Sequence, residues 1–175
     1  MARVLVLGGT RSGKSAFAES LLASSEVVDY LAASTVPDDD PEWAGRVALH
    51  QARRPATWRT VETADVAAEL AHEASPVLID SVTSWLTRAM DESGSWAGGD
   101  DDGVALAAAI DRLVDAWATT SRHAVAVSDE VGSGVVPESP AGRLFRDMLG
   151  MLNQRLAKAA DEVYLVVAGI GQRLK

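Results

Sequence analysis

The chain has 175 residues and a mass of 18.4 kDa, which favours one folded domain, because two domains of this total size would each lack room for a core. Its 25 acidic and 16 basic residues give a net charge of −9, which argues against a broad surface for nucleic acids or anionic membranes. The chain has no cysteine, which excludes disulfides and thiolate metal sites. It also shows no signal-peptide layout and no apolar run near the roughly 20 residues that span a bilayer. We therefore expect one soluble, cytoplasmic domain over residues 1–175.

Strand-like and helix-like segments alternate along the chain. Short runs of apolar and β-branched residues predict strands at 3–7, 27–32, 58–61, 76–80, 124–128 and 163–167. Helix formers with apolar spacing predict helices at 14–22, 41–53, 65–74, 104–119 and 140–160. This alternation is typical of a doubly wound α/β sheet.

Two further features belong to the second half of the chain. The last predicted helix carries Leu144, Met148, Leu152 and Leu156 on one stripe, which indicates its buried face. Residues 91–103 (DESGSWAGGDDDG) are rich in glycine and acids, which predicts an exposed, mobile loop inside the domain.

The clearest motif is GGTRSGKS at residues 8–15, which matches GxxxxGK[ST] and lies between a predicted strand and a predicted helix. Glycines let backbone N–H groups turn toward phosphate oxygens, and the helix start adds the positive end of its dipole. We expect Lys14 to reach the β- and γ-phosphates and the Ser15 hydroxyl to bind Mg²⁺. The expected phosphate-binding residues are Gly8, Gly9, Thr10, Arg11, Ser12, Gly13, Lys14 and Ser15.

Acidic side chains end two of the predicted strands. A carboxylate that organises Mg²⁺ should stand at the carboxyl end of a strand near the phosphate loop. Asp80 ends VLID and fits this position, while the pair Asp129 and Glu130 follows AVAVS and competes for the role. The alternative for each is a solvated acid that ends a strand or caps a helix.

The motifs narrow the class of nucleotide-binding protein. Residues 129–132 spell DxxG, which senses the γ-phosphate in GTPases, but the chain has no [NT]KxD motif for reading guanine. The signature loop of an ABC-type ATPase is also absent from the sequence. A small-molecule kinase and a nucleotidyltransferase remain.

A basic cluster surrounds one histidine in the second predicted helix. Arg46, His50 and Arg53 are spaced i, i+4 and i+7, and Arg54 follows. Cationic side chains could hold a polyphosphate while a neutral imidazole attacks its α-phosphorus. The alternative is a solvated helix face. His72 and His123 have no comparable neighbours, and we expect both to be structural.

Four sequence blocks together resemble one enzyme family. These are GGTRSGKS, the HxxxRP stretch at 50–55 with WRT after it, DEVG at 129–132 running into GVVPE, and NQRLA at 153–157 followed by ADEV. In this order they resemble the bifunctional adenosylcobinamide kinase / adenosylcobinamide-phosphate guanylyltransferase of cobalamin biosynthesis. The resemblance runs from about Arg3 to Lys175. The phosphate loop is generic, whereas the other three blocks are much more specific.

The resemblance implies a two-step enzyme. A nucleoside triphosphate, ATP or GTP, phosphorylates the aminopropanol hydroxyl of adenosylcobinamide, and GTP then guanylylates the histidine that opens HxxxRP, here His50. The GMP passes to the cobinamide phosphate to give adenosylcobinamide-GDP. A P-loop (RecA-like) fold with a mostly parallel sheet, helices on both faces and three layers is also implied, as is a homo-oligomer, expected to be a trimer.

The residue roles expected from motif and resemblance fall into three groups. His50 and Lys14 form the catalytic group, and Ser15, Asp80 and Glu130 form the Mg²⁺ group. Beyond the phosphate loop, the nucleotide-binding group adds Arg46, Arg53, Arg54, Glu62 and Asp80. The family often carries Asn where this chain has Asp129, and Glu where it has Asp80.

Two other functions compete with this one. A P-loop kinase for another small metabolite would need no covalent nucleotide, and a nucleotide-dependent switch or binding module would release no pyrophosphate without an acceptor. Trp43, Trp85 and Trp96 are the aromatic candidates for stacking on a corrinoid or a base, although we expect packing for each.

Overall fold

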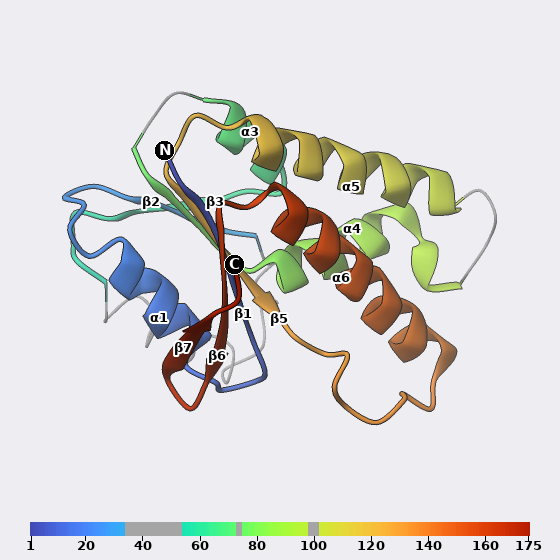
Figure 1. Cartoon of the computed structure of the whole chain (residues 1–175). Helices are drawn as coiled ribbons and strands as arrows, with labels where there is room; N and C mark the ends of the chain where they lie inside the picture. Colours follow the sequence, from blue (N-terminus) through green and yellow to red (C-terminus); the bar gives the residue numbers. More distant parts are fainter. Residues whose placement is uncertain (34–53, 73–74, 98–101) are drawn as a thin grey trace.

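The computed structural model describes residues 1–33, 54–72, 75–97 and 102–175 (Figure 1). Its strands are β1 (Arg3–Gly8), β2 (Asp29–Ala32), β3 (Arg59–Glu62), β4 (Val77–Asp80), β5 (Ala124–Asp129), β6 (Glu162–Val167) and β7 (Ile170–Arg173). Its helices are α1 (Lys14–Leu21), α3 (Val66–Ala71), α4 (Val82–Ser93), the 3₁₀ turn η1 (Ser95–Ala97), α5 (Asp102–Thr119) and α6 (Pro140–Ala159). None of these helices is both long and apolar enough to cross a membrane.

The described strands form one sheet in the order β3-β2-β4-β5-β1-β6-β7. All neighbouring pairs are parallel except β6 and β7, which form an antiparallel hairpin. The inner strands are continuous apolar runs such as Val77–Ile79 because a parallel sheet covered on both faces leaves neither face to water. The carboxyl ends of six strands therefore meet at one rim of the sheet.

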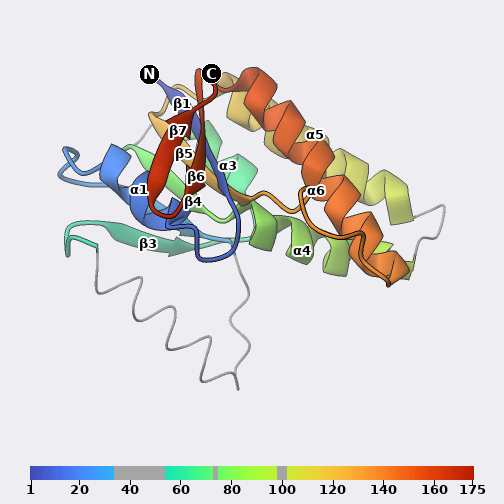
Figure 2. The same cartoon turned by 60° about the horizontal axis from the view of Figure 1, so that its bottom comes forward.

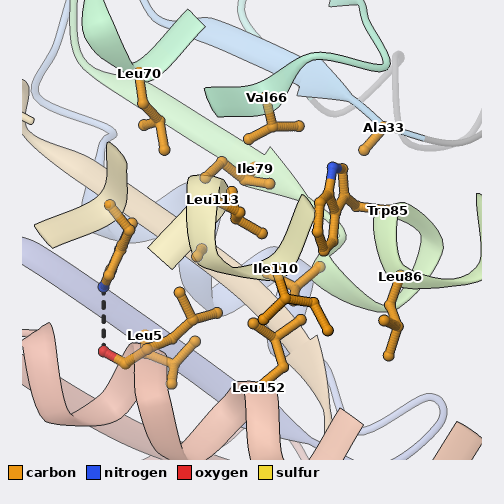
Figure 3. Close-up of a cluster of buried hydrophobic side chains, with 14 of the residues drawn as sticks. Leu5, Ala33, Val66, Leu70, Ile79, Trp85, Leu86, Ile110, Leu113 and Leu152 are labelled. Carbon is orange, nitrogen blue, oxygen red and sulfur yellow. Dashed lines mark hydrogen bonds between the residues drawn. The ribbon is translucent and has the colours of Figure 1, made fainter. Parts of the chain in front are cut away.

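Helices cover both faces of the sheet, as Figures 1 and 2 show. Alternate residues of β1 separate the two cores: Leu5 packs with α4, α5 and α6, whereas Val4 and Val6 pack on the side of α1. The larger core gathers side chains such as Ile79, Trp85 and Leu152 (Figure 3). The expected α/β fold, with a mostly parallel sheet between two helical layers, is confirmed.

Most expected elements are also confirmed, with bounds that shift by a few residues. On α6, Leu152 and Leu156 are buried, and Leu144 and Met148 pack against the same core. The helix expected at 41–53 lies outside the described residues.

The expectation of an exposed loop at 91–103 is wrong at both ends. Residues 91–93 complete α4, Ser95 is buried within η1, and α5 already begins at residue 102. The helix α4 itself is absent from the sequence-based expectation. Its signals are a side chain at Ser81 that caps Ser84 N, an apolar face that includes Trp85 and Leu86, and Gly94 in the left-handed conformation at the end.

Candidate nucleotide-binding site

The phosphate loop folds as the motif requires, between the end of β1 and the start of α1. Gly13 caps α1 with φ 90°, and Arg11 also has a positive φ of 57°. A Cβ on Gly13 would lie 2.9 Å from Gly169 Cα, which real Cβ contacts do not tolerate. Glycine is therefore required at position 13 for both its backbone angle and its contact.

The hairpin between β6 and β7 supports this loop from the side. Val167 pairs with Ile170, so the turn has only two residues, Ala168 (φ 51°) and Gly169 (φ 81°). Two positive φ angles are the signature of a type I′ turn. Gly169 N donates to Ser12 O at 2.7 Å, which fixes the turn against the phosphate loop.

Lys14 is held by an acid from the neighbouring strand. Its Nζ lies 2.6 Å from Asp129 Oδ1 and donates to Gly9 O at 3.3 Å. The two charged side chains keep 13% and 23% of their surface exposed. Asp129 is clamped through its backbone, because its N–H donates to Thr83 Oγ1 at 2.9 Å and its carbonyl accepts from Asn153 Nδ2 at 3.0 Å. A charged pair of fixed position thus stands beside the phosphate loop.

Strand register places the second acid on the same side of the sheet. Gly8 pairs with Asp129, and Val127 pairs with Asp80 on the next strand. Alternate residues share a face, so Asp129 follows Val127, and Asp80 follows Leu78, on the face that α1 covers. Both carboxylates therefore belong to the rim and to the face from which α1 and the phosphate loop start.

Asp80 accepts a hydrogen bond from Tyr30 on β2. The Tyr30 hydroxyl donates to Asp80 Oδ2 at 2.5 Å, and only 5% of Tyr30 is exposed. Burial of the phenol and the neighbouring Asp80 charge both raise the pKa of Tyr30 well above its ordinary value. Tyr30 is therefore a permanent donor to this carboxylate.

Arg54 reaches the same tyrosine from the basic motif. Its guanidinium carbon lies 3.6 Å from the centre of the Tyr30 ring, within the range of a cation–π contact. Its Nη1 also donates to Thr60 Oγ1 at 3.3 Å. Arg54 thus connects the end of the HxxxRP block with the side chain that holds Asp80.

The Glu130 carboxylate serves the loop that follows β5. Glu130 Oε1 accepts from Gly132 N at 2.8 Å, Oε2 accepts from Ser133 N at 3.4 Å, and Glu130 N donates to Gly8 O at 3.0 Å. Its oxygens therefore shape the turn at 132–133. Glu130 therefore has a structural role in this loop, and its expected role as a metal ligand stays a prediction.

The donor set at this rim fits a magnesium ion in complex with a nucleotide. Mg²⁺ prefers oxygen ligands and is held by one or two carboxylates together with substrate phosphates and water. The Asp80 carboxylate and the Ser15 hydroxyl supply such oxygens. The buried Ser12 hydroxyl, which has no hydrogen-bond partner in the described part of the chain, is a further polar group under the loop. Among the described residues, no cluster of three acidic or histidine side chains forms a metal cage of the protein alone.

Other residues expected at the site take different positions. Arg46, His50, Arg53 and Trp43 lie outside the described residues. Glu62 ends β3 at the edge of the sheet and is exposed.

The two described tryptophan candidates pack within the protein. Trp85 is 6% exposed and belongs to the larger core. Trp96 stacks on Phe145 with ring centres 6.0 Å apart and donates to Asp91 at 2.6 Å. Packing thus accounts for both side chains.

The sequence did not single out Tyr30, Thr83 or Asn153 as parts of the site. Tyr30 could have been found from the two-residue period of its strand, since it shares a face with Leu78 and Asp80. Asn153 stands in the NQRLA block, and its Oδ1 accepts from Ser128 Oγ at 2.7 Å. Thr83 carries no signal, because its role depends on the unpredicted helix α4.

Comparisons with known proteins agree with the motifs. A family model described as "Cobinamide kinase / cobinamide phosphate guanyltransferase" matches residues 4–174. The "Bifunctional adenosylcobalamin biosynthesis protein CobU" of Escherichia coli (strain K12) is 42% identical, and the alignment covers 98% of this chain and 99% of that protein. The corresponding protein of Salmonella typhimurium (strain LT2) is 41% identical over the same shares. The "Bifunctional adenosylcobalamin biosynthesis protein CobP" of Pseudomonas aeruginosa is 38% identical, covering 99% and 97%.

Proposed function

The chain belongs to the cobinamide kinase / cobinamide phosphate guanyltransferase family, and from this premise we propose how its residues divide the two reactions. It is a cobinamide kinase and a cobinamide-phosphate guanylyltransferase. The observation that carries the assignment of roles is the Lys14–Asp129 pair beside the phosphate loop, at 2.6 Å. We place both reactions at the rim where this pair, Asp80 and the start of α1 meet.

In the kinase reaction, a hydroxyl oxygen of adenosylcobinamide attacks the γ-phosphorus of a nucleoside triphosphate. The bond from the γ-phosphorus to the β,γ-bridging oxygen breaks, the nucleoside diphosphate leaves, and the hydroxyl proton is released. The loop amides and Lys14 hold the phosphates, and Lys14 exchanges its bond with Asp129 for contacts with them. The exchange costs little, because one charge-assisted contact replaces another.

In the guanylyl transfer, we assign the nucleophile to His50. A neutral imidazole nitrogen attacks the α-phosphorus of GTP, the bond to the α,β-bridging oxygen breaks, and pyrophosphate leaves. A phosphate oxygen of cobinamide phosphate then attacks the same phosphorus, the N–P bond breaks, and adenosylcobinamide-GDP is released. Arg46, Arg53 and Arg54 would favour the neutral imidazole by repelling its protonated form, and would bind phosphate oxygens.

Bound Mg²⁺ would supply charge neutralisation on the phosphate oxygens. We assign its protein ligands to the Ser15 hydroxyl and the Asp80 carboxylate, and keep Glu130 as a third candidate. These oxygen donors match the preference of the ion.

Product analysis tests the function. The purified chain is incubated with adenosylcobinamide, GTP and Mg²⁺, and corrinoid products are identified by mass. We expect the phosphate to form first and the GDP derivative to follow. Formation of the phosphate alone would remove the transferase half, and no conversion with any nucleoside triphosphate would contradict both halves.

Intact-protein mass tests the covalent step. With GTP and Mg²⁺ but no acceptor, we expect the wild type to gain one acid-labile GMP. His50→Ala should gain none, and His72→Ala, which removes another of the three histidines, should gain as much as the wild type. An unmodified wild type, or an adduct retained by His50→Ala, would overturn the assignment.

We also propose that the enzyme acts in the cytoplasm, where nucleoside triphosphates are abundant, and that it assembles as a homotrimer. The family resemblance supports both proposals. Sedimentation equilibrium checks the trimer, since the 18.4 kDa chain would give about 55 kDa, three times its mass.

A further inference from the structure

Three side chains from separate segments, Arg54, Tyr30 and Asp80, contact one another in turn near the carboxyl-terminal rim of the sheet. Arg54 lies over the ring of Tyr30, and the hydroxyl of Tyr30 donates to Asp80. Tyr30 thus contacts both Arg54 of the basic block and Asp80, the acid that ends β4. It lies inside the sheet layer, and no motif includes it.

We propose that Tyr30 is a positioning residue for both reactions: its hydroxyl orients the Asp80 carboxylate toward the divalent cation, and its ring seats Arg54. The inference rests on the proposed function of the site. It adds a role for a residue that would touch neither nucleotide nor acceptor.

The sheet explains why a tyrosine can make both contacts. Tyr30 pairs with Leu78 on one side and Thr60 on the other, so all three side chains share one face. Asp80 is the diagonal neighbour two residues after Leu78, within reach of a long aromatic side chain. On the opposite side, Thr60 accepts from Arg54 at 3.3 Å and keeps the guanidinium above the ring. A shorter residue at position 30 would reach neither partner.

The two contacts differ in what they require from Tyr30. The contact with Asp80 needs the hydroxyl, whereas the contact with Arg54 needs the aromatic ring. Tyr30→Phe removes the first and keeps the second, and Tyr30→Leu removes both. The chain also offers a matched control, because its only other tyrosine, Tyr164, donates to another acid, Glu162, at 2.7 Å.

The direct readout is binding of Mn²⁺ in the presence of GTP, measured by the loss of the free-ion signal in electron paramagnetic resonance. Partners that orient a metal ligand commonly change metal affinity by 10–100-fold. We expect Tyr30→Phe to weaken Mn²⁺ binding by roughly tenfold, with the affinity for GTP without metal unchanged. Tyr164→Phe should bind Mn²⁺ like the wild type.

Guanylylation of the protein separates the two roles. We expect excess Mg²⁺ to restore the rate of Tyr30→Phe, because its Arg54 seat is intact. The rate of Tyr30→Leu should stay low at every Mg²⁺ concentration. Equal behaviour of the two variants would overturn the role of the ring.

A double-mutant cycle with Asp80→Asn tests whether Tyr30 acts through Asp80. We expect Tyr30→Phe to lower Mn²⁺ affinity in the wild type and to cause no further loss in Asp80→Asn. Additive losses, or a Tyr30→Phe variant that binds Mn²⁺ like the wild type, would overturn the inference. A wild type that binds Mn²⁺ with GTP but takes up no GMP would contradict the proposed covalent step and leave the cycle decisive for Tyr30.

Discussion

The two rims of the sheet carry charged pairs that differ in burial and in the number of their partners. At the amino-terminal rim, Asp29 Oδ2 lies 2.5 Å from Arg122 Nη2, and Asp29 Oδ1 lies 2.6 Å from Arg59 Nη2. The side chains of Asp29 and Arg122 are only 8% and 1% exposed. Arg122 also donates to two backbone carbonyls, at 2.8 and 2.9 Å. At the carboxyl-terminal rim, Lys14 and Asp129 form a more exposed pair.

This difference in burial supports the proposed division of roles, with stability at the amino-terminal rim and chemistry at the carboxyl-terminal rim. Asp29 and Arg122 are buried and held by fixed partners, so removal of one leaves the other buried with fewer partners. The ammonium of Lys14 keeps water access and one main partner, so phosphate oxygens can replace that partner. Burial and the number of partners, rather than the residue types, separate the two roles.

The largest expected effect is on stability at the amino-terminal rim. Arg122→Ala should lower the free energy of unfolding by about 3–5 kcal/mol, because it leaves the buried Asp29 with one partner fewer and two carbonyls without a donor. Denaturant unfolding measures the loss. Arg112→Ala is the control, since this exposed arginine lies 3.5 Å from Asp65 and its loss should cost less than about 1 kcal/mol. Equal losses would break the comparison.

The next effect is on activity at the carboxyl-terminal rim. Lys14→Ala should lower the rate of acceptor phosphorylation about 100- to 1,000-fold, because the preorganised ammonium that binds oxygens of the transferred phosphate is lost. Its free energy of unfolding should change by no more than about 1 kcal/mol, since the pair with Asp129 is partly hydrated. A large loss of stability with little loss of rate would reverse the roles of the two rims.

The sequence predicts the carboxyl-terminal rim better than the amino-terminal one. The phosphate loop, Lys14 and the strand-end acids follow from local motifs and from the carboxyl ends of apolar runs. The Asp29–Arg122 pair joins residues 93 positions apart, and only the register of β2, β4 and β5 brings them together. The sequence did not single out Tyr30 for the same reason, because its partners Asp80 and Arg54 come from other segments.

Helix α4 and strand β7 were missed for different reasons. The α4 segment does carry a helical spacing of buried residues at Val82, Trp85, Leu86 and Met90, so its local signal was present and was not used. Strand β7 is short and lies at the edge of the sheet, so little apolar pattern marks it. Its importance comes from the turn before it, which contacts the phosphate loop.

At the carboxyl-terminal rim, the backbone angle of Gly13 should matter more for the stability of the fold than the charged pair Lys14–Asp129 does. Gly13→Ala should destabilise the fold by roughly 1–2 kcal/mol, since alanine is strained at φ 90° and its Cβ would clash with Gly169. Gly9→Ala is the matched control, because a Cβ there meets nothing within 4 Å. Thermal unfolding of the two variants decides, and equal midpoints would contradict the strain at Gly13.

The smallest effect concerns acid stability at the amino-terminal rim. Hydrogen bonds from Arg3 lower the pKa of Asp161 from 3.8 to about 2. Because the folded pKa is the lower one, the pair stabilises the fold above about pH 4, and this contribution is lost as the pH falls toward 2. Asp161→Asn should flatten that part of the stability profile slightly, since the carboxylate is exposed. An unchanged acid slope in urea unfolding would remove this contribution.

Hydrogen exchange with and without GTP and Mg²⁺ tests the division between the rims most directly. We predict that nucleotide slows exchange in residues 8–15, 80–84 and 128–132, where the phosphate loop and its neighbouring strand ends lie. Exchange in residues 75–77 and 120–125, around the buried Arg122, should stay unchanged. Protection that appears at the amino-terminal rim, or that is missing from the phosphate loop, would contradict the assignment of chemistry to one rim and stability to the other.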